Sequence, residues 1–347
     1  MIVFYAENPS TFINGISLSN KELFKIFKTK KKVLWIEEFG QRKLFKEFFS
    51  IFKIFKTIVF NKKVKYFYCV LPASTLGLAK IFLILKIISL INKNVKYLFH
   101  IHRGDFIKII KQKFIFRFLL NNIKEKYNSI HLIFAISEKL KVDLNTFFKK
   151  KIKIFVKRNV LPFNHSTKPL NTFLSKSKIK LIYLSNITVS KGIIDLCKKI
   201  SKKKYYELVI FGKILDPISQ KFFQNNSFNN IKLKSPLNNT QKKFDILREY
   251  DAMILPSKNE GDPLCIIEAM SVGLPVICYN VGYIKETLGN DYDLYLDKNN
   301  LSQIYKKLKK TNYRRKISYN LICKFKKRKK INKNISVLIH KALYFNK

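Results

Sequence analysis

Two glutamates with seven residues between them are the side chains whose type and spacing best suit chemistry on a ligand. Glu260 stands directly before Gly261, where a loop carboxylate can project toward a bound molecule. Glu268 follows in an apolar run typical of a helix, and a carboxylate there can accept hydrogen bonds from two hydroxyl groups. Leu264 and Cys265 lie in the first turn of this helix, so their backbone N–H groups have no partner within it and can bind a diphosphate. The segment therefore predicts a site for a phosphorylated ligand that carries hydroxyl groups.

Prolines and glycines define the elements that would hold these groups. An apolar strand at 252–255 precedes the loop, and a helix is predicted with Pro263 in its first position. Gly273 stands just past the end of this helix, as helix-terminating glycines do. Asp262 could cap the same helix and so compete with a diphosphate for its N–H groups. We expect the helix N-terminus at the carboxyl edge of a sheet, where α/β proteins bind ligands.

Runs typical of strands alternate with runs typical of helices along much of the chain. The predicted strands are 66–70, 95–101, 130–136, 179–184, 208–211, 252–255 and 275–278. The predicted helices are 74–91, 106–123, one capped by Ser137, 191–200, 241–250 and 263–272. Strands separated by helices of this length form βαβ units in a parallel sheet covered on both faces. We therefore predict an α/β protein with two doubly wound, Rossmann-like domains.

The length of 347 residues exceeds the usual size of a single core and predicts two domains. The polar segment 164–171, which contains a proline, is the candidate linker. We predict an N-terminal domain at 1–165, a C-terminal domain at 166–318, and a basic helical tail at 319–347. The tail is expected to pack back toward the N-terminal domain.

Basic residues dominate the composition, with 69 Lys plus Arg against 22 Asp plus Glu and a formal net charge of +47. This excess favours an anionic partner, either a nucleic acid or an acidic membrane surface. Lys, Asn, Ile and Phe are also used heavily throughout, as an AT-rich genome would produce, so the composition leaves both explanations open. The hydrophobic content of 47% excludes a disordered chain.

The cellular compartment is predicted from cysteines and apolar runs. The five cysteines are odd in number and widely separated, which indicates reduced core thiols in the cytoplasm. Residues 1–6 lack a preceding basic region and are typical of a first strand rather than a signal peptide. The apolar run 73–91 is interrupted by Lys80 and Lys86, so we interpret it as a buried helix rather than a membrane span.

The segment around the two glutamates resembles the glycosyl transferases group 1 family, whose retaining members have the two-domain GT-B fold. The family's run is Glu-Gly-x-Pro-Leu, followed by Glu-Ala-Met-x-x-Gly-x-Pro-Val. The matching positions are Glu260, Gly261, Pro263, Leu264, Glu268, Ala269, Met270, Gly273, Pro275 and Val276. The resemblance extends forward to the glycine turn at 281–282 and back to the strand at 251–257.

The resemblance also implies a basic group for the donor phosphates. Residues 184–187, followed by Lys191, are similar to the loop where the family places this group. The family's usual Gly-Arg pair is replaced here by Ser185 and Asn186. We therefore expect Lys191 and Asn186 to bind the donor together with Gly261 and the helix amides.

The first half of the chain resembles the family more loosely. Asn14 and Gly15 lie in a segment similar to the family's glycine-containing loop near donor and acceptor. A strand at 95–101 ends in a loop with His102, Arg103 and Asp105, where the family often places a histidine near the transferred sugar. His102 is preferred over His100 because it lies further into the loop.

The family implies that a nucleoside-diphosphate sugar is the donor and that a saccharide or lipid-linked saccharide is the acceptor, with retention of anomeric configuration. Glu260 and His102 are the expected catalytic residues, Glu268 is expected on the ribose, and no cofactor or metal ion is expected. The acidic pair Asp291 and Asp293 is interpreted as a loop feature rather than a metal site. Two alternatives stay open: a GT-B enzyme that hydrolyses or epimerises a nucleotide sugar, and a basic nucleic-acid-binding protein.

Relatives in surface polysaccharide biosynthesis imply a location on the cytoplasmic face of a membrane. The run 106–120 supports this expectation, because as a helix it combines apolar bulk with Lys108, Lys111, Lys113 and Arg117. Basic amphipathic helices bind anionic lipid interfaces. An ordinary helix packed on the sheet is the competing interpretation.

Overall fold

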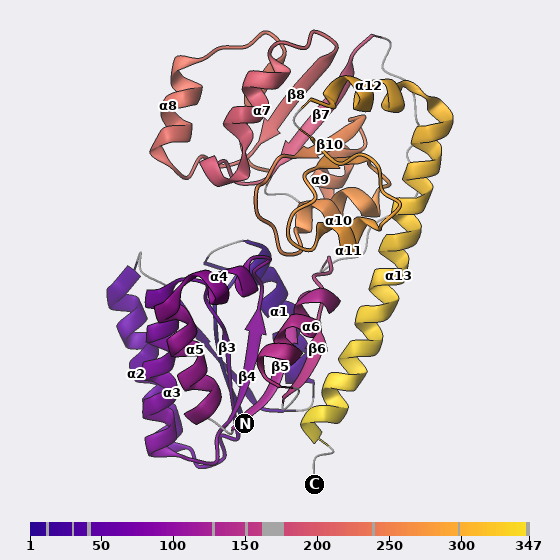
Figure 1. The fold of residues 1–347 in the computed structure, drawn as a ribbon. Coiled ribbons are helices and arrows are strands. Elements are labelled where there is room, and N and C mark those ends of the chain that lie inside the picture. The colour runs from indigo at the N-terminus through magenta and orange to yellow at the C-terminus, as the bar shows by residue number, and fades with distance from the viewer. Residues whose placement is uncertain are drawn as a thin grey trace. The chain divides into compact units, whose positions relative to one another are not determined.

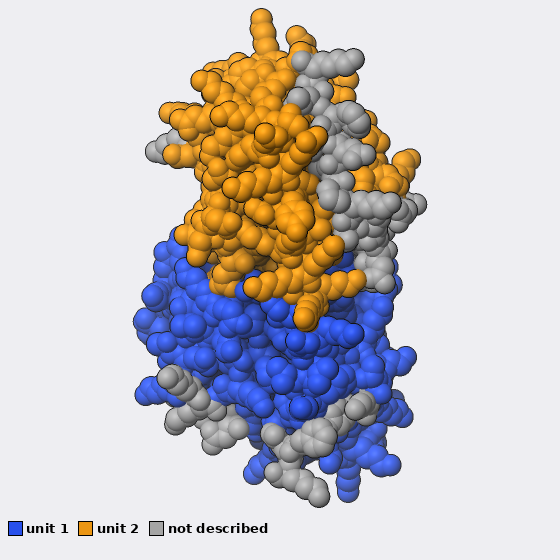
Figure 2. Space-filling model, turned by 90° about the vertical axis from the view of Figure 1, so that its right-hand side faces the viewer, with its two compact units in different colours: residues 1–162, 331–347 blue, residues 163–330 orange. Residues whose placement is uncertain are grey.

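The computed structural model divides the chain into two compact units (Figures 1 and 2). Unit 1 comprises residues 1–162 and 331–347, and unit 2 comprises residues 163–330. The structure describes residues 1–11, 14–29, 31–39, 43–126, 129–149, 152–161, 177–237, 240–297 and 299–344. The predicted linker and the boundary between 165 and 166 lie outside the described residues.

Unit 1 is built on a six-stranded, fully parallel sheet with the strand order β2-β1-β3-β4-β5-β6. Its strands are β1 (Ile2–Ala6), β2 (Val33–Glu37), β3 (Tyr66–Val70), β4 (Lys96–Ile101), β5 (Ile130–Ala135) and β6 (Lys153–Val156). Its helices are α1 (Gly15–Lys28), α2 (Leu44–Phe60), α3 (Thr75–Ile91), α4 (Phe106–Gln112), α5 (Phe114–Lys126) and α6 (Glu138–Phe147). The central strands are almost wholly buried, as expected for a parallel sheet covered on both faces.

Unit 2 has a five-stranded parallel sheet with the strand order β11-β10-β7-β8-β9. Its strands are β7 (Ile179–Leu184), β8 (Tyr206–Phe211), β9 (Ile231–Lys234), β10 (Ala252–Leu255) and β11 (Val276–Cys278). Its helices are η2 (Val189–Lys191), α7 (Ile193–Ile200), α8 (Pro217–Asn225), α9 (Thr240–Leu247), α10 (Leu264–Ser271), α11 (Ile284–Leu288) and α12 (Leu301–Lys309). The two parallel α/β sheets confirm the predicted fold class.

A long helix, α13 (Thr311–Tyr344), contributes side chains to both units. In unit 2, Arg314 forms a buried ion pair with Asp251 at 2.8 Å. In unit 1, Ile339 and Leu343 belong to the hydrophobic core beside the sheet. The basic segment predicted from residue 319 is therefore part of a helix that begins earlier, at Thr311.

One predicted helix is wrong, because the run 106–123 forms two helices, α4 and α5, that meet at Lys113. The backbone of Lys113 is extended, with φ −108° and ψ 104°. On a straight helix Phe106 and Phe116 would lie about 15 Å apart along the axis. The break brings their ring centroids to 5.7 Å, and both rings are fully buried. The gain in packing favours two short helices over one long one.

The apolar run 73–91 forms helix α3, whose N-cap is Ser74. Five of its side chains are buried: Leu78, Ile81, Ile84, Leu85 and Ile88. Within the described part of the chain, no helix combines the length and apolarity needed to cross a membrane.

Candidate functional site

The predicted basic and acidic groups of unit 2 meet where the strand order of its sheet reverses. Strand β7 is flanked by β8 and β10, so the loops that follow β7 and β10 diverge, and α/β proteins bind ligands at such a point. Lys191 follows β7 and Glu260 follows β10. The Lys191 Nζ lies 2.5 Å from Glu260 Oε1, and the Glu260 side chain is largely buried. An ion pair thus joins two residues 69 positions apart in the sequence.

Two glycines allow the loops of this site to approach each other closely. Gly192 has φ +69°, and a Cβ at this position would lie 2.2 Å from the carbonyl oxygen of Pro256. Gly282 has φ +58°, and its Cβ would meet the carbonyl oxygen of Glu260 at 1.6 Å. Any larger residue at either position would clash with backbone and adopt a strained conformation. The glycine turn at 281–282 therefore packs directly on the loop that carries Glu260.

Helix α10 follows this loop and carries the second glutamate. Pro263 is the N-cap, one position before the helix, rather than its first residue. Leu264 and Cys265 are the first helical residues, so the helix itself offers no acceptor for their N–H groups. Glu268 lies about one turn further along and is buried.

Lys243 of α9 is a site residue that the sequence analysis missed. Its Nζ donates to Glu268 Oε1 at 2.9 Å. Burial raises the pKa of the Glu268 carboxyl, and Lys243 opposes this rise by favouring the ionised form. In a chain with 69 Lys and Arg residues, no local pattern distinguishes this lysine from the others.

The possibility that Asp262 caps α10 is contradicted by its contacts. The N-cap of the helix has no side-chain hydrogen bond. Asp262 instead accepts from Thr287 Oγ1 at 3.0 Å and forms a buried ion pair with Arg328 of α13. Asp262 therefore joins the Glu260 loop to α13. Since it does not cap α10, it does not compete with a diphosphate for the N–H groups of that helix.

Asn186 lies on the exposed loop after β7, and its carbonyl oxygen accepts from the Tyr183 hydroxyl at 2.8 Å.

The acidic residues Asp291 and Asp293 each form an ion pair with a different lysine. Asp291 pairs with Lys324 and Asp293 pairs with Lys307, each at 2.8 Å.

The predicted histidines of unit 1 lie side by side at the end of β4. The ring centroids of His100 and His102 are 3.8 Å apart. His100 Nδ1 is hydrogen-bonded to the Tyr68 hydroxyl at 2.9 Å, whereas the buried Nε2 atoms of both rings have no hydrogen-bond partner among the residues that the structure describes. Burial, with a smaller contribution from the Lys157 ammonium, lowers the pKa of His102 to about 3. His102 is therefore a neutral imidazole at physiological pH.

The remaining predicted residues of unit 1 pair locally. Asn14 is the N-cap of α1 and forms a capping box with Ser17, while Gly15 is the first helical residue. The Nδ2 of Asn14 also donates to Glu7 Oε2 at 2.7 Å. Arg103 binds Asp105 through two parallel hydrogen bonds of 2.8 and 2.7 Å. Asn14 and Gly15 follow the carboxyl end of β1 in the chain, and Arg103 and Asp105 follow that of β4.

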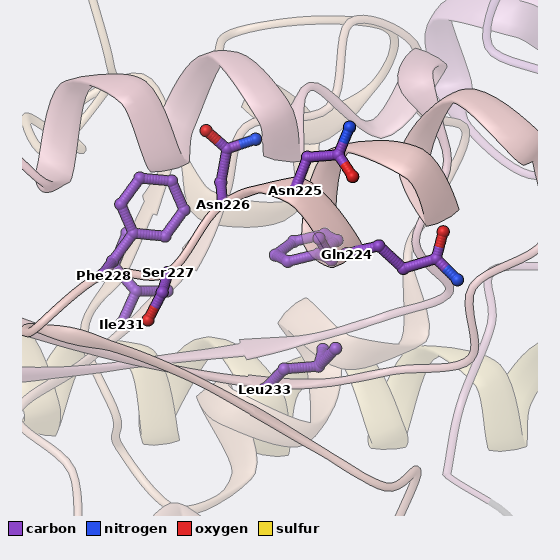
Figure 3. A pocket seen from close by; sticks show the side chains of 8 residues that line it. Gln224, Asn225, Asn226, Ser227, Phe228, Ile231 and Leu233 are labelled. Carbon is purple, nitrogen blue, oxygen red and sulfur yellow. The ribbon is translucent and has the colours of Figure 1, made fainter.

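A separate hollow of about 400 Å³ lies at the end of α8 (Figure 3). Its lining residues are Phe223, Gln224, Asn225, Asn226, Ser227, Phe228, Ile231 and Leu233. None of the predicted site residues lines it, and no charged side chain is among these eight. We therefore assign it no role in binding a diphosphate.

Comparison with known families and curated proteins supports the sequence resemblance. The model of the family described as glycosyl transferases group 1 matches residues 168–336. A teichuronic acid biosynthesis glycosyltransferase of Bacillus subtilis (strain 168), TuaC, is 25% identical over 188 residues. The matched region covers 50% of this chain and 44% of TuaC, so the chain matches less than half of that relative's length.

Solved structures share the fold over nearly the whole chain. Sucrose-phosphate synthase from Thermosynechococcus elongatus superposes with a TM-score of 0.70 at 14% identity, covering 99% of this chain and 98% of its own. HepE of Anabaena, in complex with UDP and glucose, gives 0.65 at 14% identity and covers 98% and 99%. The lipopolysaccharide outer core galactosyltransferase WaaB gives 0.60 at 13% identity with the same coverage. At these identities the likeness establishes the two-domain GT-B fold.

Proposed function

We propose that this chain, which belongs to the glycosyl transferases group 1 family through residues 168–336, transfers a sugar from a nucleoside-diphosphate sugar to a saccharide or lipid-linked saccharide acceptor. The observation that carries the proposal is the Lys191–Glu260 ion pair at the reversal of strand order in unit 2, next to the N-terminus of α10. This arrangement offers a cation and backbone N–H groups for a diphosphate and carboxylates for hydroxyl groups.

In the proposed mechanism, negative charge develops on the leaving diphosphate as the glycosidic bond breaks. Lys191 and the N–H groups of Leu264 and Cys265 stabilise this charge, which is where preorganised donors lower a barrier most. The reaction therefore requires no metal ion in this proposal. Glu268 holds the ribose hydroxyls and Asn186 contacts the donor beside Lys191.

The sugar is assigned to Glu260 and His102. Glu260 binds the hydroxyls of the donor sugar and stabilises an oxocarbenium-like state, and the anomeric configuration is retained. His102, neutral because burial lowers its pKa to about 3, contacts the sugar near the reacting carbon as a hydrogen-bonding group rather than as a cation.

Relatives suggest the class of substrate and the place of action. HepE binds UDP and UDP-glucose, WaaB is a galactosyltransferase of the lipopolysaccharide outer core, and TuaC is assigned to teichuronic acid biosynthesis. We therefore propose a UDP-hexose donor, a role in surface polysaccharide biosynthesis, and action at the cytoplasmic face of a membrane.

A thermal-shift screen against UDP-, GDP-, ADP- and TDP-sugars tests the donor site, and we expect stabilisation by UDP-sugars. Product analysis with and without a lipid-linked saccharide then distinguishes the reactions. Transfer to the acceptor supports the proposal. Sugar release or isomerisation that does not depend on the acceptor would instead show that the enzyme is a hydrolase or an epimerase. Steeply salt-dependent DNA binding without any response to nucleotide sugars would favour a nucleic-acid-binding protein.

A further inference from the structure

Helix α2 of unit 1 exposes large apolar side chains over most of its outward surface. The exposed residues are Leu44, Phe45, Phe48, Phe49, Phe52, Val59 and Phe60, with exposed fractions from 49% to 81%. At 100° per residue they span an arc of about 160°. A narrower set of residues, among them Ile54 and Ile58, faces inward and is buried. The helix therefore buries a narrow face, made of Glu47, Ser50, Ile54 and Ile58, and leaves a broad apolar face exposed.

The apolar surface continues over the neighbouring helices α3 and α5. Helix α3 packs against both α2 and α5, and the three lie side by side on one face of the sheet (Figure 1). The exposed apolar residues there are Leu76, Leu83, Ile87, Leu90 and Ile91 of α3 and Phe114, Ile115 and Phe118 of α5. Soluble monomers rarely expose a contiguous apolar surface spread over several elements, and such surfaces mark interaction sites.

The charges on this surface indicate the chemistry of the partner. Lys46, Lys53 and Lys56 are exposed on α2. At 100° per residue, Lys46 and Lys53 lie just beyond one edge of the apolar arc, and Lys56 lies within it. The only acid in α2 or α3 is Glu47, which is buried and paired with Lys80 of α3 at 2.7 Å. An apolar face that carries basic residues, with no exposed acid in α2 or α3, matches a bilayer that carries anionic headgroups.

We propose that the outward face of α2, α3 and α5 docks unit 1 on an anionic lipid bilayer, with the phenylalanines of α2 inserted below the headgroups. This assignment rests on the membrane location in the proposed function and names its surface. It also moves the main contact away from the predicted run 106–120. In that run Phe106, Ile109 and Ile110 of α4 are buried, and the exposed apolar residues belong to α5.

Flotation of the full chain with lipid vesicles tests the proposal. We expect binding to vesicles of phosphatidylglycerol mixed with phosphatidylcholine, weaker binding in high salt, and little binding to pure phosphatidylcholine. Replacing Phe45, Phe48 and Phe52 by Gln should abolish flotation. Replacing Lys46, Lys53 and Lys56 by Gln should weaken binding on the order of a hundredfold, because each lysine near an anionic surface contributes about fivefold.

Matched variants control for the general effect of these changes. Val142, Ile218 and Val337 are exposed apolar residues outside α2, α3 and α5, and their replacement by Gln should leave flotation unchanged. The corresponding lysine control replaces Lys198, Lys221 and Lys232, which are exposed in unit 2. All substituted side chains are at the surface, and circular dichroism checks that each variant is folded.

Several outcomes would overturn the assignment. They are absence of flotation by the unaltered chain, equal loss in the phenylalanine variant and its control, or equal binding to vesicles with and without phosphatidylglycerol. A dimer in light scattering that the phenylalanine variant dissociates would assign the surface to a second copy of the chain. Thermal shifts with nucleotide sugars, measured on the same proteins, separate the two proposals. Vesicle binding without nucleotide-sugar binding would refute the donor site. Nucleotide-sugar binding without vesicle binding would refute only the docking surface.

Discussion

At residue scale, Lys191 has two competing partners in the proposed mechanism, Glu260 and the donor diphosphate. Lys191→Met should weaken binding of a nucleoside diphosphate by about 1.5 to 3 kcal/mol, the range for a charged hydrogen bond. Glu260→Gln should leave this affinity unchanged or raise it, because it releases Lys191, and should chiefly lower kcat. Calorimetric titration with UDP and initial rates check both. Lys258→Met, which removes an exposed lysine nearby, serves as the control. Equal loss of UDP affinity in Glu260→Gln would move Glu260 into the phosphate site.

Glu268 is the second residue whose role can be isolated. Its Oε1 accepts from Lys243, which leaves Oε2 for a ribose hydroxyl. Glu268→Gln should weaken nucleotide binding by about 1.5 to 3 kcal/mol, whereas Glu249→Gln at an exposed position should not. The effect should be much smaller for inorganic diphosphate than for UDP, since only UDP carries a ribose. A similar loss for both ligands would contradict the ribose assignment.

The buried His102 makes the stability of unit 1 depend on pH. The fold lowers its pKa from 6.5 to about 3, so below pH 6.5 the unfolded chain binds a proton that the folded chain does not. Its contribution to stability is complete above pH 6.5 and falls by up to about 1.4 kcal/mol per pH unit as the pH drops toward 3. Urea unfolding followed by fluorescence of the single tryptophan, Trp35, should show a weaker pH dependence in His102→Gln. An unchanged slope would mean that His102 is protonated in the folded protein.

The two glutamates could be predicted because a dense local motif surrounds them, whereas their partners could not. Lys243 and Arg328 lie 25 and 66 residues from Glu268 and Asp262, and only the fold brings each pair together. The same limit applies to Asp262, whose possible role as a cap of α10 the sequence alone leaves open. Its position before a helix is typical of a cap, but a buried arginine from α13 forms a stronger, charged interaction with it.

At element scale, a buried ion pair between Arg328 and Asp262 joins α13 to the loop that carries Glu260. Arg328→Met leaves Asp262 buried without its cation and should destabilise unit 2 by about 3 to 5 kcal/mol. The double change Arg328→Met with Asp262→Ala should recover much of this loss, because no unpaired charge remains. Urea unfolding in the presence and absence of UDP checks both, with the exposed Lys327→Met as the control. A double variant no more stable than Arg328→Met would show that the loss of stability does not come from an unpaired charge on Asp262.

The elements themselves follow local patterns with different success. Ser137 caps α6 as predicted, since its Oγ accepts from the Leu140 N–H at 2.9 Å, a contact encoded within four residues. The break at Lys113 had no such signal, because a lysine fits a helix well and the cause is the packing of Phe106 against Phe116. The type of each element was therefore predictable from periodicity. The break between α4 and α5 at Lys113 was not, because it results from packing in the tertiary core.

At the scale of the whole molecule, two parallel α/β units could be predicted from the alternation of strands and helices, and the basic tail was expected to pack toward the N-terminal domain. The residues of α13 that enter the core of unit 1, Ile339 and Leu343, could not be predicted. The Tyr66 hydroxyl donates to the carbonyl oxygen of Leu343, 277 residues away, at 3.4 Å. His131 Nε2 is within hydrogen-bond distance of the Ala342 carbonyl oxygen at 3.3 Å. Contacts between residues so far apart leave no pattern along the chain. The core of unit 1 therefore depends on apolar residues that are hard to recognise in the basic C-terminal segment.

This dependence predicts that a change near the C-terminus destabilises the N-terminal sheet. Ile339 is fully buried in the core cluster that also includes Phe4 and Tyr68, and Trp35 packs against the same cluster. Ile339→Ala should lower the free energy of unfolding of unit 1 by about 2 to 5 kcal/mol, because it leaves a cavity in that core. Trp35 fluorescence should then report unfolding at a lower urea concentration. Val337→Ala, at a position 54% exposed on the same helix, should leave the transition in place. If Ile339→Ala does not move the Trp35 transition, the end of α13 does not stabilise the sheet of unit 1.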